Sequence, residues 1–332
     1  MSDVPLSPGT GLGNYHVVRA VGRGEFGTLY ESRRGRGSFT LRGKKVEEQW
    51  AVDNEISMMN GLPQHTHVTT FLDSVAHGNT IYFVLEDCNI GTLNDFLIKE
   101  KPPEQFLQSL MFDMAKGIFH LHRNKIVHRD LNPNNVLLSA GNHRPICKIF
   151  NLSLAQYGNC HNQLDSVPNV LDISTHADLH LFLTTRCSDK FWPPEIKDPG
   201  DSFRFASDIF SLGLVFLSMV SLRVKHDKYL SKDIIYPPTV KRSSGVTPLF
   251  LCSLQDVKEV VASIVNSAAV QDLVCGMLHP THGKRPQAGQ LVAAMETFVA
   301  PDRSIPIGFI VLLSLAVLLI VVIVTWKLTF DY

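Results

Sequence analysis

The sequence lacks several features that would place it in a specialised class of protein. Its six cysteines form no Cys-x-x-Cys pair, and scattered single cysteines are typical of reduced thiols in a cytosolic domain. The 31 basic residues equal the 31 acidic residues in number, so the charge balance gives no indication of a nucleic-acid partner. Internal repeats and low-complexity tracts are also missing.

The N-terminal segment 1–14 lacks an apolar run, and position 2 is not glycine. The first absence argues against a secretory signal peptide, and the second argues against myristoylation. We therefore expect residues 1–14 to form a short flexible lead.

Apolar runs long enough to cross a membrane are missing until the C-terminus. Segment 307–326 contains no charged side chain, and about 20 residues at about 1.5 Å each match the ~30 Å core of a bilayer. We predict a linker at 300–306, a transmembrane helix at 307–326 that contacts the lipid bilayer, and a short non-cytosolic tail at 327–332. The preceding domain is then expected in the cytosol. A buried core helix or a lipid-anchor signal are the alternatives.

The remaining chain changes from strand-like to helix-like patterns. Strands are predicted at Tyr15–Val21, Thr28–Ser32 and Thr80–Leu85, with a helix at Val46–Leu62 between them. An amphipathic helix follows, because six apolar residues recur at 3.6-residue spacing: Phe106, Leu110, Met111, Met114, Ile118 and Leu121. Further helices are predicted at Phe205–Val220 and Val257–Met277.

The first motif with chemical meaning is the glycine-rich loop Gly22-Arg-Gly24-Glu-Phe-Gly27-Thr-Leu29. Glycines allow the backbone to bend close to a phosphate group and to present its N–H groups. On its own the pattern is equally typical of an ordinary hairpin.

A far more specific motif follows the amphipathic helix, His128-Arg-Asp130-Leu-Asn-Pro-Asn-Asn135. From about residue 15 to 299 the chain resembles the eukaryotic protein kinases, whose catalytic loop has this pattern. Pro133 favours the Ser/Thr type over the Tyr type. The resemblance implies an α+β, two-lobed fold with a small lobe at 15–86, a larger helical lobe at 87–299, and ATP bound between them.

Three later segments support the same resemblance. Phe191-Trp-Pro-Pro-Glu195 resembles the family's A-P-E segment, and Asp208-Ile-Phe-Ser-Leu-Gly213 resembles its D-x-W-S-x-G motif. Arg285 resembles the late arginine that pairs with the A-P-E glutamate. A narrower likeness to the Clik-type Ser/Thr kinases is faint.

The resemblance also implies roles for individual residues. Asp130 would be the catalytic base, Asn135 a metal ligand, and Lys44 the strand-three lysine that pairs with Glu55. Lys45 is the alternative to Lys44, because the V-A-x-K pattern is degraded here. The implied nucleotide-binding positions include the gatekeeper and the hinge: Gly22, Gly24, Gly27, Leu29, Lys44, Leu85, Glu86 and Cys88.

The sequence departs from the family where magnesium is held. Lys148-Ile-Phe-Asn151-Leu-Ser-Leu-Ala155 stands where K-I-x-D-F-G-L-A is expected, so the metal ligand Asp is replaced by Asn151. An amide oxygen carries no full charge, whereas magnesium prefers charged oxygens. Asn132 also replaces a lysine that is usual near the transferred phosphate. These changes favour a pseudokinase that binds ATP weakly, with magnesium doubtful; an active but divergent Ser/Thr kinase is the alternative.

One group of residues lies outside the family pattern. Segment 157–191 contains Cys160, His161, His176, His180 and Cys187. Two histidines at i and i+4 of a helix can bind zinc. A polar loop with incidental histidines is the alternative, because these spacings match no standard zinc set.

Overall fold

The computed structural model describes residues 6–24, 27–45, 49–158, 190–197, 204–227, 232–243, 245–297 and 299. The chain divides into one unit at Met1–Phe298 and a second at Val299–Tyr332. All described helices and strands belong to the first unit.

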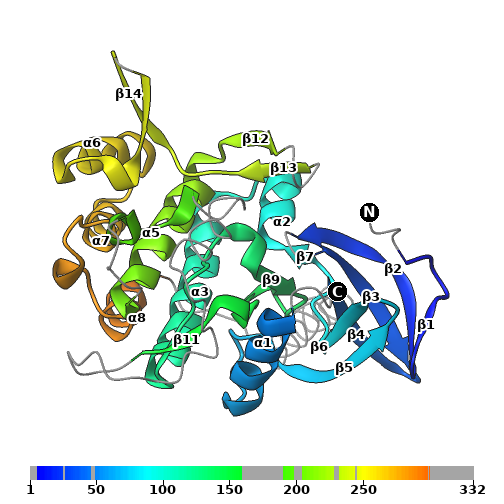
Figure 1. Ribbon diagram of the computed structural model, residues 1–332. Helices are drawn as coiled ribbons and strands as arrows, with labels where there is room; N and C mark the ends of the chain where they lie inside the picture. Colours follow the sequence, from blue (N-terminus) through cyan, green and yellow to red (C-terminus); the bar gives the residue numbers. More distant parts are fainter. Residues whose placement is uncertain are drawn as a thin grey trace, which may run out of the picture. The chain divides into compact units, whose positions relative to one another are not determined.

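The first part of this unit is an antiparallel sheet with strand order β1-β2-β3-β4-β6-β5. Its strands are β1 (Gly11–Leu12), β2 (Tyr15–Gly24), β3 (Gly27–Arg34), β4 (Gly37–Lys45), β5 (Phe71–His77) and β6 (Thr80–Leu85). Helix α1 (Gln49–Gly61) connects β4 to β5 and lies beside the sheet (Figure 1). The turn between β3 and β4 uses Gly35 at φ +59°, a conformation that glycine adopts without strain.

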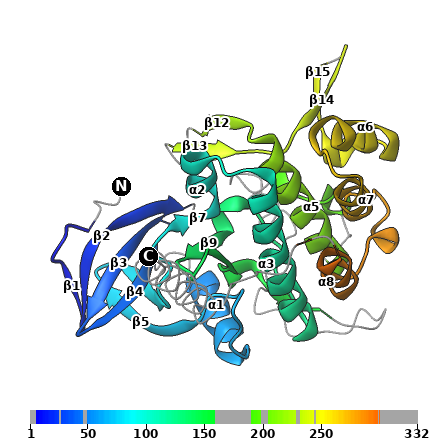
Figure 2. The ribbon, with the colours of Figure 1, turned by 180° about the vertical axis from the view of Figure 1, so that it is seen from behind.

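The second part is mainly helical and lies on the other side of the unit in both ribbon views (Figure 2). Its helices are α2 (Leu93–Glu100), α3 (Glu104–Arg123), α5 (Phe205–Ser221), α6 (Leu254–Ile264), α7 (Ala268–Met277) and α8 (Ala288–Glu296). Of the apolar positions that predicted α3, all except Phe106 are fully buried. Helix α3 packs against α5, α8 and β10 (Ile146–Ile149), so it forms the centre of this part. The two-lobed α+β fold is therefore confirmed.

Two short sheets position the loops between α3 and α5. Strand β9 (Val136–Ser139) pairs with β10 on one side and with β7 (Gly91–Thr92) on the other. Strand β8 (Ile126–Val127) pairs with β11 (Gln156–Tyr157). These pairings bring residues 128–135 next to residues 150–155.

The prediction of a single helix at Val257–Met277 was wrong. The chain forms α6 and α7 instead, with Val265 in an extended conformation (φ −99°, ψ 126°) between them. Val265 is buried, and the next side chain, Asn266, donates a hydrogen bond to Glu104. These contacts, together with Ser267 at the start of α7, favour a turn over a continuous helix.

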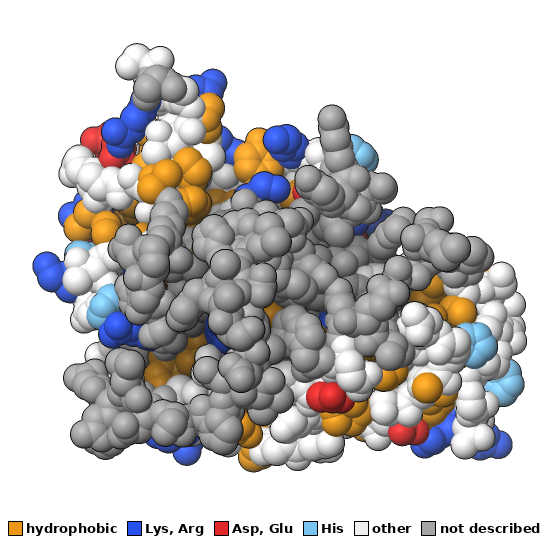
Figure 3. Space-filling model, in the orientation of Figure 1, with side chains coloured by type: hydrophobic (Ala, Val, Ile, Leu, Met, Phe, Trp, Pro, Cys, Tyr) orange, Lys and Arg blue, Asp and Glu red, His pale blue; other side chains and the backbone are white. Residues whose placement is uncertain are grey.

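The sequence also missed two hairpins after α5. Strands β12 (Val224–Asp227) and β13 (Lys232–Ile235) pair with each other, as do β14 (Thr239–Arg242) and β15 (Gly245–Pro248). The second hairpin projects from the unit in Figure 1. On the described part of the face in Figure 3, Lys and Arg side chains are scattered among acidic, apolar and uncharged ones.

Several predictions concern residues that the structure does not describe. The expected transmembrane helix at 307–326 and the Cys/His residues of segment 157–191, from Cys160 to Cys187, lie outside the described residues. Among the residues that are described, none of the helices combines the length and the apolar character needed to cross a membrane.

Candidate active site

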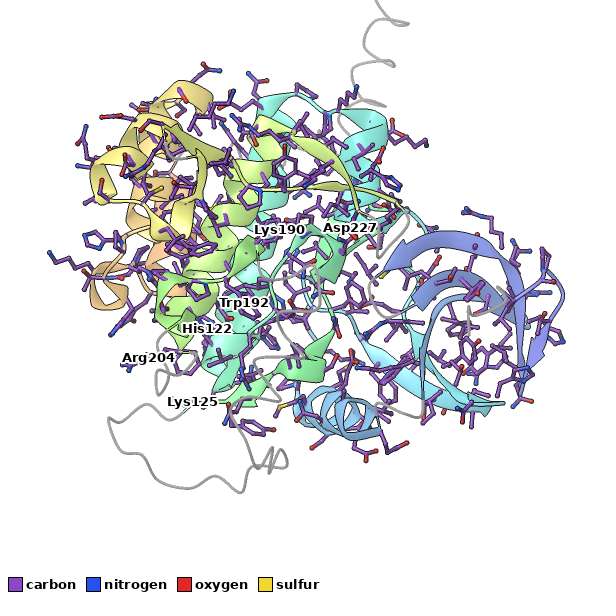
Figure 4. The ribbon with its side chains drawn as sticks, turned by 45° about the horizontal axis from the view of Figure 1, so that its top comes forward. His122, Lys125, Lys190, Trp192, Arg204 and Asp227 are labelled. Atoms are coloured by element: carbon purple, nitrogen blue, oxygen red, sulfur yellow. The ribbon has the colours of Figure 1, made fainter. Side chains whose placement is uncertain are left out.

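The loop that follows β8 is held in shape by the buried carboxylate of Asp208. Asp208, near the start of α5, accepts hydrogen bonds from the backbone N–H groups of His128 (2.8 Å) and Arg129 (2.9 Å). The side chain of His122, labelled in Figure 4, lies 2.9 Å from the same carboxylate. Because Asp208 binds both N–H groups, the loop has little freedom to move away from α5.

Asp130 lies at the centre of a group of asparagines. Its exposed fraction is only 3%. The Asn135 amide donates to the Asp130 backbone oxygen and to Asp130 Oδ2, both at 2.7 Å. Asn132 turns back on the same residue and donates to Asp130 Oδ1 at 3.2 Å. Asn132 therefore positions the carboxylate, instead of supplying a positive charge for a phosphate.

Asn151 stands at the point where the chain turns into the short helix η3 (Leu152–Leu154). Its backbone is in the left-handed region, at φ 68° and ψ 68°, a conformation that asparagine tolerates better than most residues. Asn151 Nδ2 donates to Asn135 Oδ1 at 2.9 Å. Asn151 Oδ1 accepts from Arg42 Nη2 at 2.9 Å and from the Ser153 hydroxyl. Because a guanidinium can only donate, it determines which way this amide points.

Arg42 is a residue of this site that the sequence analysis missed. Its Nη1 donates to Glu55 Oε1 at 2.7 Å and to Oε2 at 3.0 Å. Lys44, the predicted partner of Glu55, lies farther away, with 3.7 Å between its Nζ and Glu55 Oε2. Both cations come from β4 and are two positions apart, so they lie on the same face of the strand. The alternative, Lys45, ends β4, and its side chain is outside the described residues.

The register of the sheet explains why Arg42 makes the closer pair. Thr40 lies opposite the predicted gatekeeper Leu85, and Arg42 lies opposite Phe83. The Arg42 guanidinium carbon lies 5.8 Å from the Phe83 ring centre and 5.3 Å from that of Phe150. Cation–π contacts of this kind are favourable. The two aromatic rings and Glu55 thus surround the Arg42 guanidinium, which is almost completely buried.

The predicted hinge is also bonded within the protein. The backbone N–H of Cys88 donates to Thr40 Oγ1 at 2.8 Å, so this donor is already used before any adenine arrives. Glu86 accepts from the Thr70 N–H at 2.8 Å and forms an ion pair with Lys148 at 3.0 Å. Burial raises the pKa of the Cys88 thiol well above its ordinary value, so this cysteine is not a reactive thiolate.

The glycine-rich segment forms a hairpin in which Gly24 lies opposite Gly27. Gly27 adopts φ +117°, and a Cβ there would come within 3.0 Å of the Gly43 oxygen. A Cβ at Gly22 would lie 3.1 Å from Asp95 Oδ2. Leu29, the apolar residue of the motif, is buried. At Gly27, where φ is positive and the neighbour is backbone, a side chain would be strained in the protein itself, whereas at Gly22 the neighbour is a side chain that can move.

The residues that resemble magnesium ligands do not fit the ion in this arrangement. Asn135 Oδ1 accepts from Asn151, and Asn151 Oδ1 accepts from Arg42. Magnesium requires several hard, preferably charged oxygens in near-octahedral geometry, whereas these two oxygens are neutral and already bonded. A guanidinium beside them would in addition repel a divalent cation.

The helical lobe contains the ion pair that the sequence predicted. Arg285 donates to both carboxylate oxygens of Glu195, at 2.7 and 2.8 Å, and the Ser207 hydroxyl donates to the same carboxylate at 2.8 Å. A second ion pair joins Lys190 to Asp227 at 3.7 Å; Figure 4 labels these two residues on the helical side. The predicted Glu195–Arg285 pair is thus confirmed.

Comparison with known proteins identifies the family of this chain. Residues 15–295 match the family described as "Protein kinase domain", and the chain therefore belongs to the protein kinase family. It is similar to the carbon catabolite-derepressing protein kinase of Saccharomyces cerevisiae, with 27% identity over 281 residues, which are 76% of this chain and 41% of that protein.

Two further relatives are Ser/Thr kinases. The serine/threonine-protein kinase ste20 of Aspergillus oryzae is 25% identical over 74% of this chain and 28% of its own length. The serine/threonine-protein kinase TIO of Arabidopsis thaliana is 32% identical over 41% of this chain and 11% of its own length. This chain thus spans well under two thirds of these relatives, and the similarity supports a kinase domain of the Ser/Thr type.

Proposed function

We propose that this protein is a membrane-anchored pseudokinase that binds nucleotide weakly and acts through protein interactions. The observation that carries this proposal is the bonding of Asn151, whose oxygen accepts from Arg42 and whose nitrogen donates to Asn135. Phosphoryl transfer depends on positioning and on neutralising the charge of the phosphates. A site whose metal position is neutral and internally bonded supplies little of that neutralisation.

One specific observation favours the alternative, a divergent but active Ser/Thr kinase. Asp130 and Asn135 keep their side chains together at 2.7 Å, and Asp208 holds their loop by backbone hydrogen bonds. Asp130 would then accept the proton of a protein hydroxyl. The same contacts also hold the loop in shape in a protein without activity, so only a measurement of phosphate transfer distinguishes the two functions.

ATP should bind weakly and with little dependence on magnesium. The Cys88 N–H is donated to Thr40, which weakens adenine recognition, and Asn151 lacks the charge that recruits the metal. Ligand binding raises the unfolding midpoint by mass action. We expect ATP at millimolar concentration to raise this midpoint by about 1–2 °C, equally with magnesium and with EDTA.

The variant for comparison is Thr40→Val, which keeps the shape of the side chain but removes the hydroxyl that accepts the Cys88 N–H. ATP should then stabilise the variant more than the wild type. A rise in the wild-type midpoint that requires magnesium and grows steeply with its concentration would contradict this part of the proposal.

Removal of residues 305–332 should move the protein from the membrane fraction to the soluble fraction. The uncharged segment 307–326 is long enough to span a bilayer core and is the anchor that we propose, with the kinase-like domain in the cytosol. Fractionation of cells that express the truncated chain measures this. Removal of 327–332 alone is the control, since it leaves the apolar segment intact and should leave the protein in the membrane. Tight membrane retention of the longer truncation would show that another anchor exists.

A further inference from the structure

The guanidinium of Arg42 connects three separate parts of the kinase-like unit. It comes from β4, contacts Glu55 of α1 with Nη1, and contacts Asn151 before η3 with Nη2. Its exposed fraction is 3%, and those of Glu55 and Asn151 are 1% each. The buried Arg42 guanidinium thus has the charged Glu55 carboxylate on one side and the neutral Asn151 amide on the other. Because its N–H groups bind both acceptors at once, it acts as a structural cation.

We propose that Arg42 is a resident cation that replaces the magnesium ion, so that the site is assembled without metal and a single Asn151→Asp change does not recover metal binding. This inference rests on the proposed pseudokinase function and explains which residue maintains it. Arg42 is a positioning residue in this account, since it acts through Glu55 and Asn151.

The charges of the site support this exchange. Arg42 and Lys44 carry two positive charges, Glu55 and Asp130 carry two negative charges, and Asn151 is neutral, so these side chains balance. The site that the resemblance implies for an active kinase has one lysine and three carboxylates. That arrangement has an excess of two negative charges, which a divalent cation neutralises. In this protein, the additional positive charge of Arg42 and the loss of a carboxylate at position 151 together remove the excess negative charge. No divalent cation is then needed to neutralise the site.

The contacts around Glu55 show what the resident cation holds in place. Glu55 Oε1 accepts the backbone N–H of Leu152 at 3.1 Å. The neighbouring Asn54 donates to the backbone oxygens of Leu152, Ser153 and Ala155, at 3.3, 2.8 and 3.0 Å. Helix α1 is therefore held against residues 152–155 by hydrogen bonds between protein groups. The Glu55 charge would be uncompensated at this junction without a nearby cation, and Arg42 is the closest one in the described structure.

The test measures magnesium binding without nucleotide in the full-length chain, purified in detergent. Thermal unfolding midpoints are compared in magnesium chloride and in potassium chloride of equal ionic strength. The proteins are the wild type, Asn151→Asp, Arg42→Met and the double variant Arg42→Met/Asn151→Asp. Methionine keeps an unbranched apolar stem between Phe83 and Phe150, so that the change mainly removes the charge. Lys44, already 3.7 Å from Glu55, remains to pair with that carboxylate.

We expect no magnesium-specific rise in the wild type or in either single variant. The double variant should show a saturable rise of about 5 °C, as expected when a ligand binds the folded state far above its dissociation constant. The matched control is Arg34→Met/Asn151→Asp. Arg34 also lies against aromatic rings of the sheet, 4.9 Å from that of Tyr15 and 5.5 Å from that of Phe39, but it contacts Tyr15 instead of Glu55. This control should not respond to magnesium.

Three results would overturn the inference. A magnesium-specific rise in Asn151→Asp alone would show that Arg42 is no barrier, and a folded double variant without any rise would show that removing Arg42 is not enough. Arg42→Gln/Asn151→Asp, whose side chain can still donate to Glu55, is a second double variant in case the first is unstable. Failure of both to fold in magnesium would also contradict the inference, because the ion would then not replace the guanidinium. Phosphate transfer by the wild type would end the pseudokinase proposal without deciding this result, since no ATP is present here.

Discussion

The wild-type protein should transfer phosphate from ATP to a generic protein acceptor at least about a thousandfold more slowly than a kinase with an intact metal site. A bound metal contributes several kcal/mol of transition-state stabilisation, and each ~1.4 kcal/mol is a factor of ten in rate. In this site Asn151 binds Arg42 and Asn135, and Asn132 binds Asp130. The measurement is incorporation of labelled phosphate by the full-length chain with magnesium.

Three variants would locate the cause of the low activity that we expect. Asn151→Asp should gain little, because Arg42 lies 2.9 Å from that side chain and would pair with the new carboxylate. Asn132→Lys should also gain little alone. The triple variant Arg42→Met/Asn132→Lys/Asn151→Asp should gain clearly more than the single gains combined, because these groups act as one unit.

Asp130→Asn in the triple variant is the control and should abolish any transfer that was gained. Robust transfer by the wild type, abolished by Asp130→Asn, would establish the divergent active kinase instead. In that case the asparagine network around Asp130 would be compatible with catalysis.

Arg285→Ala should lower the free energy of unfolding by about 3–5 kcal/mol, the cost of leaving one member of a buried ion pair without its partner. The Arg285 side chain is 0% exposed and that of Glu195 is 5% exposed. Urea unfolding followed by circular dichroism measures the loss. Arg242→Ala removes an exposed pair with Asp256, whose side chains are 45% and 25% exposed, and should change stability far less, because solvent screens an exposed pair. Equal effects of the two variants would contradict a special role of the buried pair.

The same pair makes stability depend on pH in a defined direction. Burial alone would raise the pKa of the Glu195 carboxyl, but the hydrogen bonds and charge of Arg285 and the Ser207 hydroxyl hold it below its ordinary value. The stabilisation is therefore complete above the ordinary pKa of glutamate, about 4.3, and is lost as pH falls through the lower folded value. The stability difference between wild type and Glu195→Gln should be constant near neutral pH and should shrink below about pH 4.

Much of the fold could be predicted from the sequence because its signals are local. Helix α3 follows from apolar residues at helical spacing, and β6 has the predicted bounds, Thr80–Leu85. The motif at 128–135 and the residues on both sides of Asn151 predict a catalytic loop and a changed metal position without any structure. The Glu195–Arg285 pair was also predicted, although it joins positions 90 residues apart, because each partner belongs to a recognisable motif.

Other features depend on contacts that no local pattern contains. The break at Val265 arises where a buried side chain and the bond from Asn266 to Glu104 favour a turn. The hairpins β12–β13 and β14–β15 are short and lack a regular apolar alternation, so the sequence did not indicate them. In each case tertiary packing outweighs local propensity.

The sequence thus determined the family to which the protein belongs. Only the tertiary structure decided which cation, Arg42 or Lys44, makes the closer pair with Glu55. In Leu41-Arg-Gly-Lys44 both basic residues lie on one face of a strand, and the motif favoured Lys44 by its spacing alone. The register between β4 and β6 places Arg42 opposite Phe83 and Thr40 opposite Leu85. That register brings the guanidinium to Glu55 and Asn151, and the Thr40 hydroxyl to the hinge. Strand register is set by pairing along the whole sheet, so the choice between two cations two residues apart cannot be read from those four residues.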